Sequence, residues 1–547
     1  MAQKSTIIIN QSAITKSESK NESLVAKKNL LNKTFQVASS TLMSRLLGLA
    51  REFLMSRYLG VSEIADAFIT AFKIPNSLRK IFAEGALSAA CIPTFVLVIK
   101  KESQQEASAL MSLSFLFFEG ILIALCLAIF WQAEWVIHLI APGWQVASEL
   151  TAQGAYAVEF LRVLIAFIIF ISSTALLTGA LQSVNHFFIP SFGPVLLNIV
   201  YIGGLLVCLK MGLSVMWLCY SILFGGFLQF MLHIGMYFRL QFSFRLPTSK
   251  TWHYFKAILI KFLPCLLSMS ILELNLFMST SLATYLPKGS ISLLYYANRF
   301  MGIPLGVLVV SFSTILLPYF SRVSTYAPRR LGIYLFEASK VVFWLTIPCT
   351  IIMVILSEKI FQTIFLSDKF SLLDVQQAGQ LLAIFLSGLF FFSLYKILLN
   401  IYYALHDTLT PCYISIAILA INYGLCKALT PLMGVNGLAL AFVLTNIIHV
   451  SLFTLFLYMN FKLPLYFKPF VGFACYASLQ IVMVVALFSV LYRSGQLLIY
   501  HATAGWYTHF LLNKLGFWLW VGPLCALAVL ILIKTRKVCN VHLYFLD

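Results

Sequence analysis

Arginine side chains lie deep inside apolar segments of this chain, where charge is rare. Arg45 and Arg51 share one such segment, Arg79 lies in the next, and Arg299 lies far downstream. A charge at the bilayer centre costs roughly 2.5–3.5 kcal/mol on insertion scales, so such a residue normally faces an aqueous cavity or a partner. A guanidinium donates paired hydrogen bonds to phosphate groups and keeps its charge at physiological pH. Arg51, Arg79 and Arg299 are therefore predicted to bind an anion such as a diphosphate.

Carboxylates in the same segments offer a structural alternative. Glu52 follows Arg51 directly, Asp66 begins the second segment, and Glu84 lies one helical turn after Lys80. Each could form an ion pair that only holds helices together, and for Lys80 and Glu84 this role is as plausible as a functional one. Basic residues outnumber carboxylates in these segments, which favours anion binding by the arginines. Glu52, Asp66, Lys80 and Glu84 are therefore gate or ion-pair candidates.

For a third group of polar residues, the sequence allows more than one role. Glu273 is a lone carboxylate in an apolar segment, where it could bind a coupling proton or cation or pair with a neighbouring helix. His406 and Asp407 precede Pro411, and a turn or cap role is favoured there over a catalytic dyad. The sequence contains no HExxH motif, no cluster of aspartates and no paired catalytic carboxylates. It therefore predicts neither a metal site nor a catalytic site.

The segments that carry these residues are predicted to span a membrane. Of 547 residues, 61% are hydrophobic and only 10% are charged, whereas a soluble domain has about a quarter charged residues. About 20 apolar residues span a bilayer as a helix, and the apolar runs are too long for the strands of a barrel. We therefore predict an all-α polytopic membrane protein of about fourteen helices. Their approximate spans are 30–57, 64–98, 108–131, 153–182, 191–209, 214–238, 257–285, 291–318, 334–356, 376–404, 411–430, 435–459, 468–492 and 514–534.

The distribution of positive charge predicts the topology. With the N-terminus inside, 21 of the 38 Lys and Arg residues fall in the N-terminal tail and the inward loops, and six fall in outward loops. This is the positive-inside bias of plasma-membrane proteins, and it places both termini in the cytoplasm. The net charge of +19 is therefore explained by the positive-inside topology and by attraction to anionic lipid of the inner leaflet. Nucleic-acid binding is not predicted.

A weak internal repeat organises the predicted helices. Short matches recur at a nearly constant interval of six helices: Ala180-Leu181 with Ala404-Leu405, Pro190 with Pro411, Met211-Gly212 with Met433-Gly434, and Asn76 and Arg79 with Asn298 and Arg299. An even number of helices keeps orientation, so the repeat would be parallel, as in some transporters. The predicted organisation is a disordered cytosolic tail (1–28), an N-lobe (29–240), a C-lobe (250–460), a helix pair (466–536) and a second cytosolic tail (537–547). The eleven scattered cysteines form no CxxC pair and are interpreted as packing residues.

The first two segments also resemble a known family. Ser44-Arg45-x-x-Gly48-x-x-Arg51-Glu52 fits its pattern S-R-x-x-G-x-x-R-[DE], and the residues from Asp66 to Ser88 fit D-A-F…K-x-P-N-x-x-R-[RK]-x-F-A-E-G-A-x-S. Further matches are Asn185 to Pro190 with Asn198, Tyr295-Tyr296-Ala-x-Arg299, Ile315 to Pro318 and Asp407 to Pro411. In these motifs the chain resembles the MurJ (MviN) family of lipid II flippases, over the residues up to about 460.

The resemblance implies a fold and a function. The fold would be that of the MOP superfamily, with two lobes forming a V around a cationic cavity and the helix pair 466–536 lining a groove for the lipid tail. Arg51, Arg79 and Arg299 would occupy the positions of the essential cavity arginines, with Ser44, Arg45 and Asn76 beside them. Asn298 and Gly302 depart from the family, which often has Asp and in some members Glu there, so the resemblance does not imply a charge partner or gate contact near Arg299.

The predicted function is therefore the transfer of undecaprenyl-diphosphate-linked lipid II from the inner to the outer leaflet by alternating access, in a bacterial plasma membrane. The partners would be lipid II, membrane lipids and the cell-wall synthesis machinery, and the protein would be a monomer without cofactors. Coupling to membrane potential, H⁺ or Na⁺ is left open. The alternatives are export of another lipid-linked oligosaccharide or a drug, an enzyme of polyprenyl phosphates, and a non-transporting scaffold for cell-wall assembly.

Overall fold

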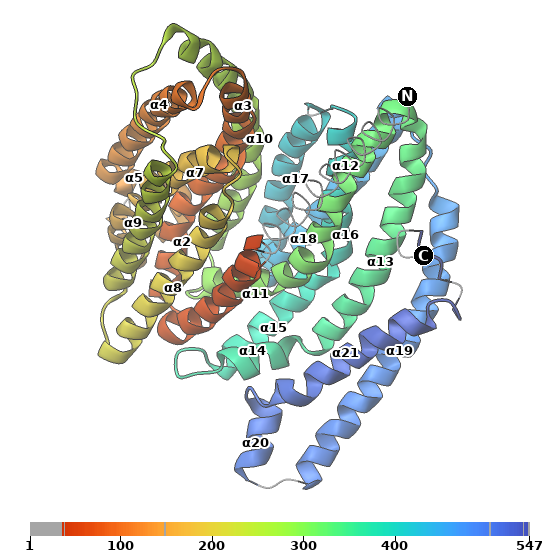
Figure 1. Cartoon of the computed structure of the whole chain (residues 1–547). Helices are drawn as coiled ribbons and strands as arrows, with labels where there is room; N and C mark the ends of the chain where they lie inside the picture. Colours follow the sequence, from red (N-terminus) through yellow and green to blue (C-terminus); the bar gives the residue numbers. More distant parts are fainter. Residues whose placement is uncertain are drawn as a thin grey trace, which may run out of the picture. The chain divides into compact units, whose positions relative to one another are not determined.

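The computed structural model describes residues 36–37, 39–146, 149–407, 409–502, 505–539 and 541–544. The predicted tail 1–28 and part of the tail 537–547 lie outside these ranges. The described chain is almost entirely helical (Figure 1), which confirms the predicted all-α class. The first helix covers residues 39–59. The elements that follow are α2 (Glu63–Leu78), η1 (Arg79–Leu87), α3 (Ser88–Lys101), α4 (Gln104–Trp131), α5 (Ala133–Ile140), η2 (Pro142–Trp144), β1 (Gln145–Val146), β2 (Glu149–Leu150), α6 (Ala152–Leu164), α7 (Phe167–Ser183), α8 (Phe188–Met211), α9 (Val215–Arg239), α10 (Ser249–Ala283), α11 (Ser290–Pro304), η3 (Leu305–Val310), α12 (Ser311–Tyr326), η4 (Pro328–Arg330), α13 (Leu331–Ile355), α14 (Ser357–Phe365), α15 (Leu372–Ser387), α16 (Leu389–Ala404), α17 (Leu409–Met433), α18 (Val435–Phe461), α19 (Phe467–Ala502), α20 (Trp506–Asn513) and α21 (Phe517–Thr535).

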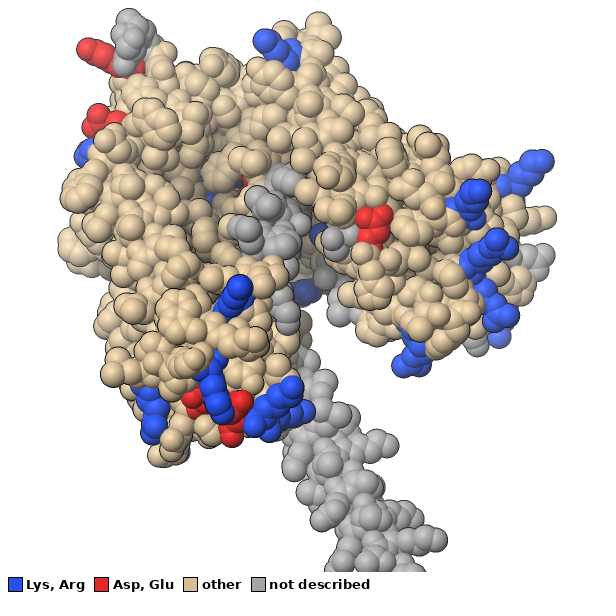
Figure 2. Space-filling view, turned by 90° about the horizontal axis from the view of Figure 1, so that it is seen from above, with Lys and Arg blue, Asp and Glu red and all other residues tan. Residues whose placement is uncertain are grey.

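The helices have the length and apolarity of membrane spans. Among the described residues, nine are long and apolar enough to cross a bilayer, or ten if the bent pair α15 and α16 forms one span. The predicted spans that fall short of this test include 30–57, 64–98, 257–285 and 291–318, which are the segments that carry Arg51, Arg79, Glu273 and Arg299. Charged side chains are sparse on the surface seen in Figure 2. The protein is therefore a multi-pass membrane protein, and the count of fourteen spans stays a prediction.

Several predicted loops are partly helical. The predicted outward loop 493–513 contains the last turns of α19 and all of α20, because no proline interrupts the chain between the predicted end of the span and Ala502. The predicted loop 357–375 contains α14, and the loop 132–150 contains α5 and a hairpin of β1 and β2 in which Gln145 pairs with Leu150. Sequence hydropathy places the spans but misses these short helices.

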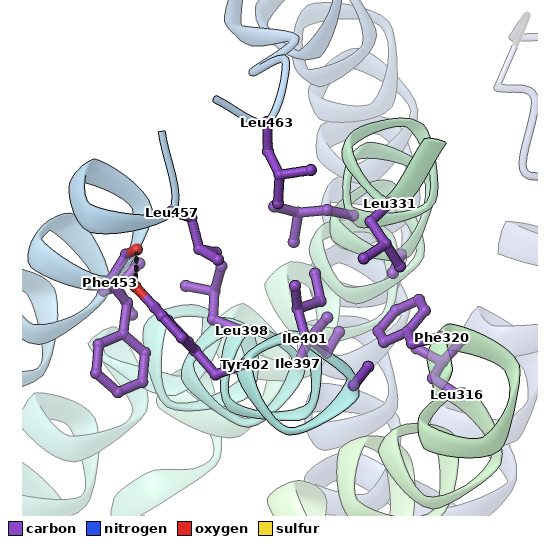
Figure 3. Close-up of a cluster of buried hydrophobic side chains, with 14 of the residues drawn as sticks. Leu316, Phe320, Leu331, Ile397, Leu398, Ile401, Tyr402, Phe453, Leu457 and Leu463 are labelled. Atoms are coloured by element: carbon purple, nitrogen blue, oxygen red, sulfur yellow. Dashed lines mark hydrogen bonds between the residues drawn. The ribbon is translucent and has the colours of Figure 1, made fainter. Parts of the chain in front are cut away.

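The chain forms two compact units. Unit 1 comprises residues 1–54, 74–132 and 160–267, and unit 2 comprises residues 55–73, 133–159 and 268–547. In unit 1 a buried cluster joins α3, α4, α7, α9 and α10, with Phe95, Phe118 and Tyr237 among its members. In unit 2 a second cluster joins α12, α13, α16 and α18, and Figure 3 shows Phe320, Tyr402 and Phe453 within it. The Tyr402 hydroxyl donates to the Phe453 carbonyl at 2.8 Å, so this buried phenol keeps a partner.

Within unit 2, one buried amide joins the C-terminal helix pair to α13. Gln480 of α19 accepts a hydrogen bond from the Trp344 indole of α13 at 3.0 Å. Its amide nitrogen donates to the Leu532 carbonyl at 2.7 Å and the Thr535 hydroxyl at 2.8 Å, both in α21. Because Gln480 is fully buried, these three bonds fix how α19, α21 and α13 pack together.

The internal repeat is visible in the backbone of the turns. The four non-glycine residues with positive φ in the described chain form two pairs with equal separation along the chain, Asn185 with His406 and Gln241 with Lys462. His406 follows the end of α16 as Asn185 follows the end of α7. In both turns, the amide of the next residue donates a hydrogen bond, 3.0 Å long, to the carbonyl that lies five residues before it. Gly212 and Gly434, with nearly the same separation, also both have positive φ. Corresponding helices in the two halves of the chain therefore end at residues with positive φ. The predicted lobe boundaries stay a prediction.

Candidate functional site

The first predicted arginine is held inside unit 1 by an amide and a carboxylate. Arg51, on the first helix, donates from Nη1 to Asn198 Oδ1 at 3.0 Å and from Nη2 to Glu52 Oε1 at 2.7 Å. Asn198 of α8 donates in turn to the Ser44 carbonyl at 3.2 Å and to its hydroxyl at 3.3 Å. The guanidinium carbon also lies 5.0 Å from the centre of the Tyr201 ring, a favourable cation–π distance.

This arrangement brings several predicted site residues together. Ser44, Arg51 and Glu52 form one network, and Asn198 is the residue that organises it although sequence reasoning gave it no role in the site. The ion pair of Arg51 and Glu52, considered as a structural alternative, is present. Arg45 lies on the same helix and is exposed. A single Asn in an apolar helix carries no distinctive signal, so only the folded chain could reveal its partner.

Arg79 is oriented by Asn76, one turn earlier in the chain. Both Nε and Nη2 of Arg79 donate to Asn76 Oδ1, at 3.1 and 3.0 Å. The amide oxygen therefore fixes the orientation of the guanidinium. Arg79 is half-buried, as is Lys80 beside it. The side chain of Glu84 lies outside the described part of the chain, so its predicted pairing with Lys80 stays a prediction.

Helix winding changes at Arg79. The α-helical α2, which contains Pro75 in its last turn, gives way to the π-helical η1, which begins at Arg79. In the other half, α11 ends at Pro304 and continues into a second π-helical segment, η3. A proline removes one donor from the helical ladder and clashes with the preceding turn, which allows the winding to loosen. The helix that carries Arg79 and the helix that carries Arg299 therefore each contain a π-helical segment.

Arg299 belongs to unit 2. It is exposed on α11, where Nε donates to the Tyr295 hydroxyl at 3.3 Å and the guanidinium carbon lies 5.3 Å from the centre of that ring. Tyr295 precedes it by one helical turn, so the two side chains meet on one face of α11. Arg299 is thus in a different compact unit from Arg51 and Arg79.

Asp66 caps the helix that carries Arg299. Its Oδ1 accepts from the Ser292 amide at 2.8 Å, and its Oδ2 accepts from the Gly289 amide at 2.7 Å and from Gln153 Nε2 at 3.3 Å. Asp66 is 2% exposed. A carboxylate is favoured at a helix N-terminus because it accepts from otherwise unpaired amides and faces the positive end of the helix dipole. The two backbone amides lie far downstream of Asp66 in the chain, so the sequence could not identify them.

A turn near residue 369 packs against the end of the first helix. The Lys369 carbonyl accepts from the Val61 amide at 3.1 Å, and Lys369 Nζ donates to the Tyr58 carbonyl at 2.8 Å. Gly60, between them, has a φ of +64°, and a Cβ there would collide with the Lys369 carbonyl. All of these residues belong to unit 2. This contact makes glycine at position 60 a geometric requirement.

The polar residues of α10 form a further site in unit 2. Glu273 is buried at 7% exposure. Lys73 of α2 donates to the Leu276 carbonyl at 2.5 Å and to the Thr280 hydroxyl. On the same helix Asn275 accepts from Asn422 of α17 at 2.6 Å.

The contact between Asn275 and Asn422 repeats the one in unit 1. Asn198 and Asn422 are separated by nearly the same interval as the paired turns, and each reaches the first long helix of its own half. The repeat therefore extends from turns to buried polar contacts.

The described residues do not contain a group of three or more His, Cys, Asp or Glu side chains that could hold a metal ion. The chemistry that the site offers is charge and hydrogen bonding from guanidinium groups. Such a set of donors can bind an anion but supplies no nucleophile or general base.

Comparisons with known proteins agree with this chemistry. The family model described as "Lipid II flippase MurJ" matches residues 55–515. The lipid II flippase MurJ of Burkholderia cenocepacia is 30% identical over 386 residues, covering 70% of this chain and 74% of that protein. The probable lipid II flippase MurJ of Helicobacter pylori is 31% identical over 399 residues, covering 69% of this chain and 84% of that protein.

Solved structures give the same result. A lipid II flippase MurJ in an inward closed conformation has a TM-score of 0.72 and 25% sequence identity, and the match covers 92% of this chain and 99% of that one. An inward-facing multidrug resistance MATE transporter of the MOP superfamily has a TM-score of 0.67 at 14% identity, which shows a shared fold. The family consists of transporters, and its members are inner-membrane proteins. This chain belongs to the MurJ family of lipid II flippases.

Proposed function

We propose that this chain moves lipid II across the bacterial plasma membrane, with its diphosphate bound by arginines inside the membrane. The observation that carries the proposal is the orientation of Arg79. Two of its donors converge on Asn76 Oδ1, so the guanidinium is held in a defined orientation. Arg79 is also half-buried within a predicted span, where a charge needs a functional reason.

The other arginines would complete the binding site. Arg51 is held by Asn198 and shares its charge with Glu52, so a diphosphate would compete with that carboxylate for the guanidinium. Arg299 is exposed on α11 and is steadied by Tyr295. Ser44, Arg45 and Asn76 would contribute further polar contacts. Glu52, Asp66, Lys80 and Glu84 would then act as gate or ion-pair residues.

Transport would follow an alternating-access cycle from the inner to the outer leaflet. The headgroup would enter from the cytoplasmic side, the undecaprenyl chain would stay in lipid, and the helix pair α19 and α21 would line a groove for it. Both termini would be cytoplasmic, as the charge distribution predicts. Membrane potential, worth about 2.3 kcal/mol per charge per 100 mV, could help release the anionic headgroup outward, and H⁺ or Na⁺ could couple through Glu273. The working unit would be a monomer that serves the cell-wall synthesis machinery.

The test measures lipid II on the outer leaflet of bacteria depleted of their own flippase. An externally added lipid II-cleaving enzyme reports the exposed substrate. Wild-type protein should restore cleavage, and Arg79→Ala should not. Arg329→Ala is the matched control, because Arg329 is an exposed arginine of η4, outside the predicted spans, and its loss should leave cleavage intact.

The other outcomes separate the alternative functions. If correctly inserted wild-type protein fails to restore cleavage, export of another lipid-linked oligosaccharide or of a drug becomes the better explanation. If Arg79→Ala restores cleavage as fully as wild type, the function stands and the role of Arg79 is refuted. A non-transporting scaffold would tolerate neutral replacement of all three arginines, and an enzyme would change the lipid chemically without moving it.

A further inference from the structure

A buried carboxyl group in unit 1 has no role in the site described above. Glu119 is 2% exposed on α4, a helix that runs from Gln104 to Trp131. It lies about 22 Å from the first of these residues and about 18 Å from the last, along a helix axis that rises about 1.5 Å per residue. α4 qualifies as a membrane span. The carboxyl group therefore sits near the middle of the bilayer.

The surroundings of Glu119 provide hydroxyl groups. Within the described part of the chain, neither Oε1 nor Oε2 has a hydrogen-bond partner, and the buried hydroxyl of Ser172 has none either. The hydroxyls of Ser172 and Ser173, on α7, lie next to the carboxyl group. A bare carboxylate at this depth is costly, and buried polar groups in proteins are normally paired.

The described side chains on the helices that pack against α4 supply no buried cation. α7 has no charged residue between Phe167 and Ser183, and Lys100 and Lys101 are exposed at the end of α3. On α10, whose Phe262 ring lies tilted against that of Phe118, Lys256 is exposed and the side chain of Lys261 lies outside the described part of the chain.

In the described part of the chain, the titratable group recorded beside Glu119 is the thiol of Cys126, also on α4. A sodium ion needs several oxygen ligands, and a carboxyl group with two neighbouring hydroxyls falls short of such a shell. A proton needs only one oxygen. The chemistry of the site therefore favours a proton over a metal cation.

We propose that Glu119 is a proton-binding site whose occupancy is linked to the position of Arg79. The proton comes from water and adds to a carboxylate oxygen to form the neutral acid, and its release to water restores the carboxylate. Only an O–H bond forms and breaks. As the neutral acid, Glu119 donates to a neighbouring serine hydroxyl, which gives these buried groups a partner.

The link to Arg79 runs through α7. This helix packs against α4, which carries Glu119, and also against the π-helical η1, which begins at Arg79. A carboxylate at position 119 favours an arrangement of α4 and α7 that admits water, whereas the neutral acid favours the closed packing seen here. Because a π-helical segment tolerates a change of winding, a shift of α7 alters the placement of Arg79. Proton binding and anion binding are then coupled in both directions.

The first experiment detects the proton without measuring transport. Infrared spectra of the purified protein in lipid bilayers should contain the carbonyl band of a buried carboxylic acid at neutral pH. Glu119→Gln should abolish this band, and Glu119→Asp should retain it at a shifted frequency. Glu106→Gln is the matched control on the same helix, because Glu106 is in the first turn of α4 and accepts from Thr248 and Thr251. An unchanged band in Glu119→Gln overturns the proposal.

The second experiment tests coupling, and it rests on the function proposed above. In proteoliposomes, the rate of lipid II transfer should change severalfold when a pH gradient is imposed on wild-type protein or Glu106→Gln. In Glu119→Gln the rates with and without the gradient should become equal. A response to the gradient as large as that of wild type overturns the coupling. If wild-type protein moves no lipid II, the proposed function fails, while the infrared result still decides whether Glu119 binds a proton.

Discussion

Asp66 offers the sharpest test of how the structure positions Arg299. Its carboxylate accepts the Gly289 and Ser292 amides at the start of α11, and the Ser292 residue is fully buried. Asp66→Ala would leave both amides without an acceptor. Each buried, unsatisfied donor costs about 1–3 kcal/mol, so the variant should lose about 2–6 kcal/mol of unfolding free energy. Asp66→Asn keeps one acceptor oxygen and should lose about half as much.

The measurement is equilibrium unfolding of the purified protein by a denaturing detergent. Glu63→Ala is the control, because Glu63 forms an ion pair with Lys288 in the same region. Those side chains are 35% and 69% exposed, and exposed ion pairs contribute about 0–1 kcal/mol. If Asp66→Ala and Glu63→Ala lower the unfolding free energy equally, the capping argument is refuted. A large loss for Asp66→Ala together with a mild loss for Asp66→Asn would support it.

Two further predictions concern the backbone and pH. Gly60→Ala should lower the melting temperature clearly, because Gly60 has a positive φ and no room for a Cβ. Gly472→Ala should not lower it, because the space around Gly472 is open. Equal melting temperatures for the two variants would contradict this reasoning. The pKa of the Glu102 carboxyl is lowered, chiefly by its hydrogen bond from Lys250, and the same bond raises the pKa of Lys250. The pair therefore stabilises the contact between the end of α3 and the start of α10 at pH values above the ordinary range of a glutamate, and this contribution is lost as the pH falls through the lowered pKa of Glu102. A carbon-13 NMR titration should find Glu102 titrating at lower pH than in Lys250→Gln, and an identical titration in the variant would refute the pairing.

Local sequence information was enough to identify the class of protein and the residues worth testing. Long apolar runs predict membrane helices because lipid offers no hydrogen-bond partners to exposed backbone N–H and C=O groups. Arg51, Arg79 and Arg299 stand out because a charge is costly in such a run. The repeat was also visible in short matches such as Met211-Gly212 with Met433-Gly434, and both glycines have positive φ. These features depend on a residue and its near neighbours along the chain.

The partners of those residues were decided by the tertiary structure. Asn198 accepts a hydrogen bond from Arg51, Asp66 caps α11, and Gly60 leaves room for the Lys369 carbonyl. In each case the two partners lie far apart in the sequence. Glu119 received no prediction from the sequence, and only the folded chain shows that it is buried beside hydroxyl groups of α7. Hydrogen bonds and close packing act over a few ångströms in space, and single-sequence patterns record only separation along the chain. The sequence by itself therefore determined which side chains must find a partner within the membrane, and the folded chain decided which partner each one found.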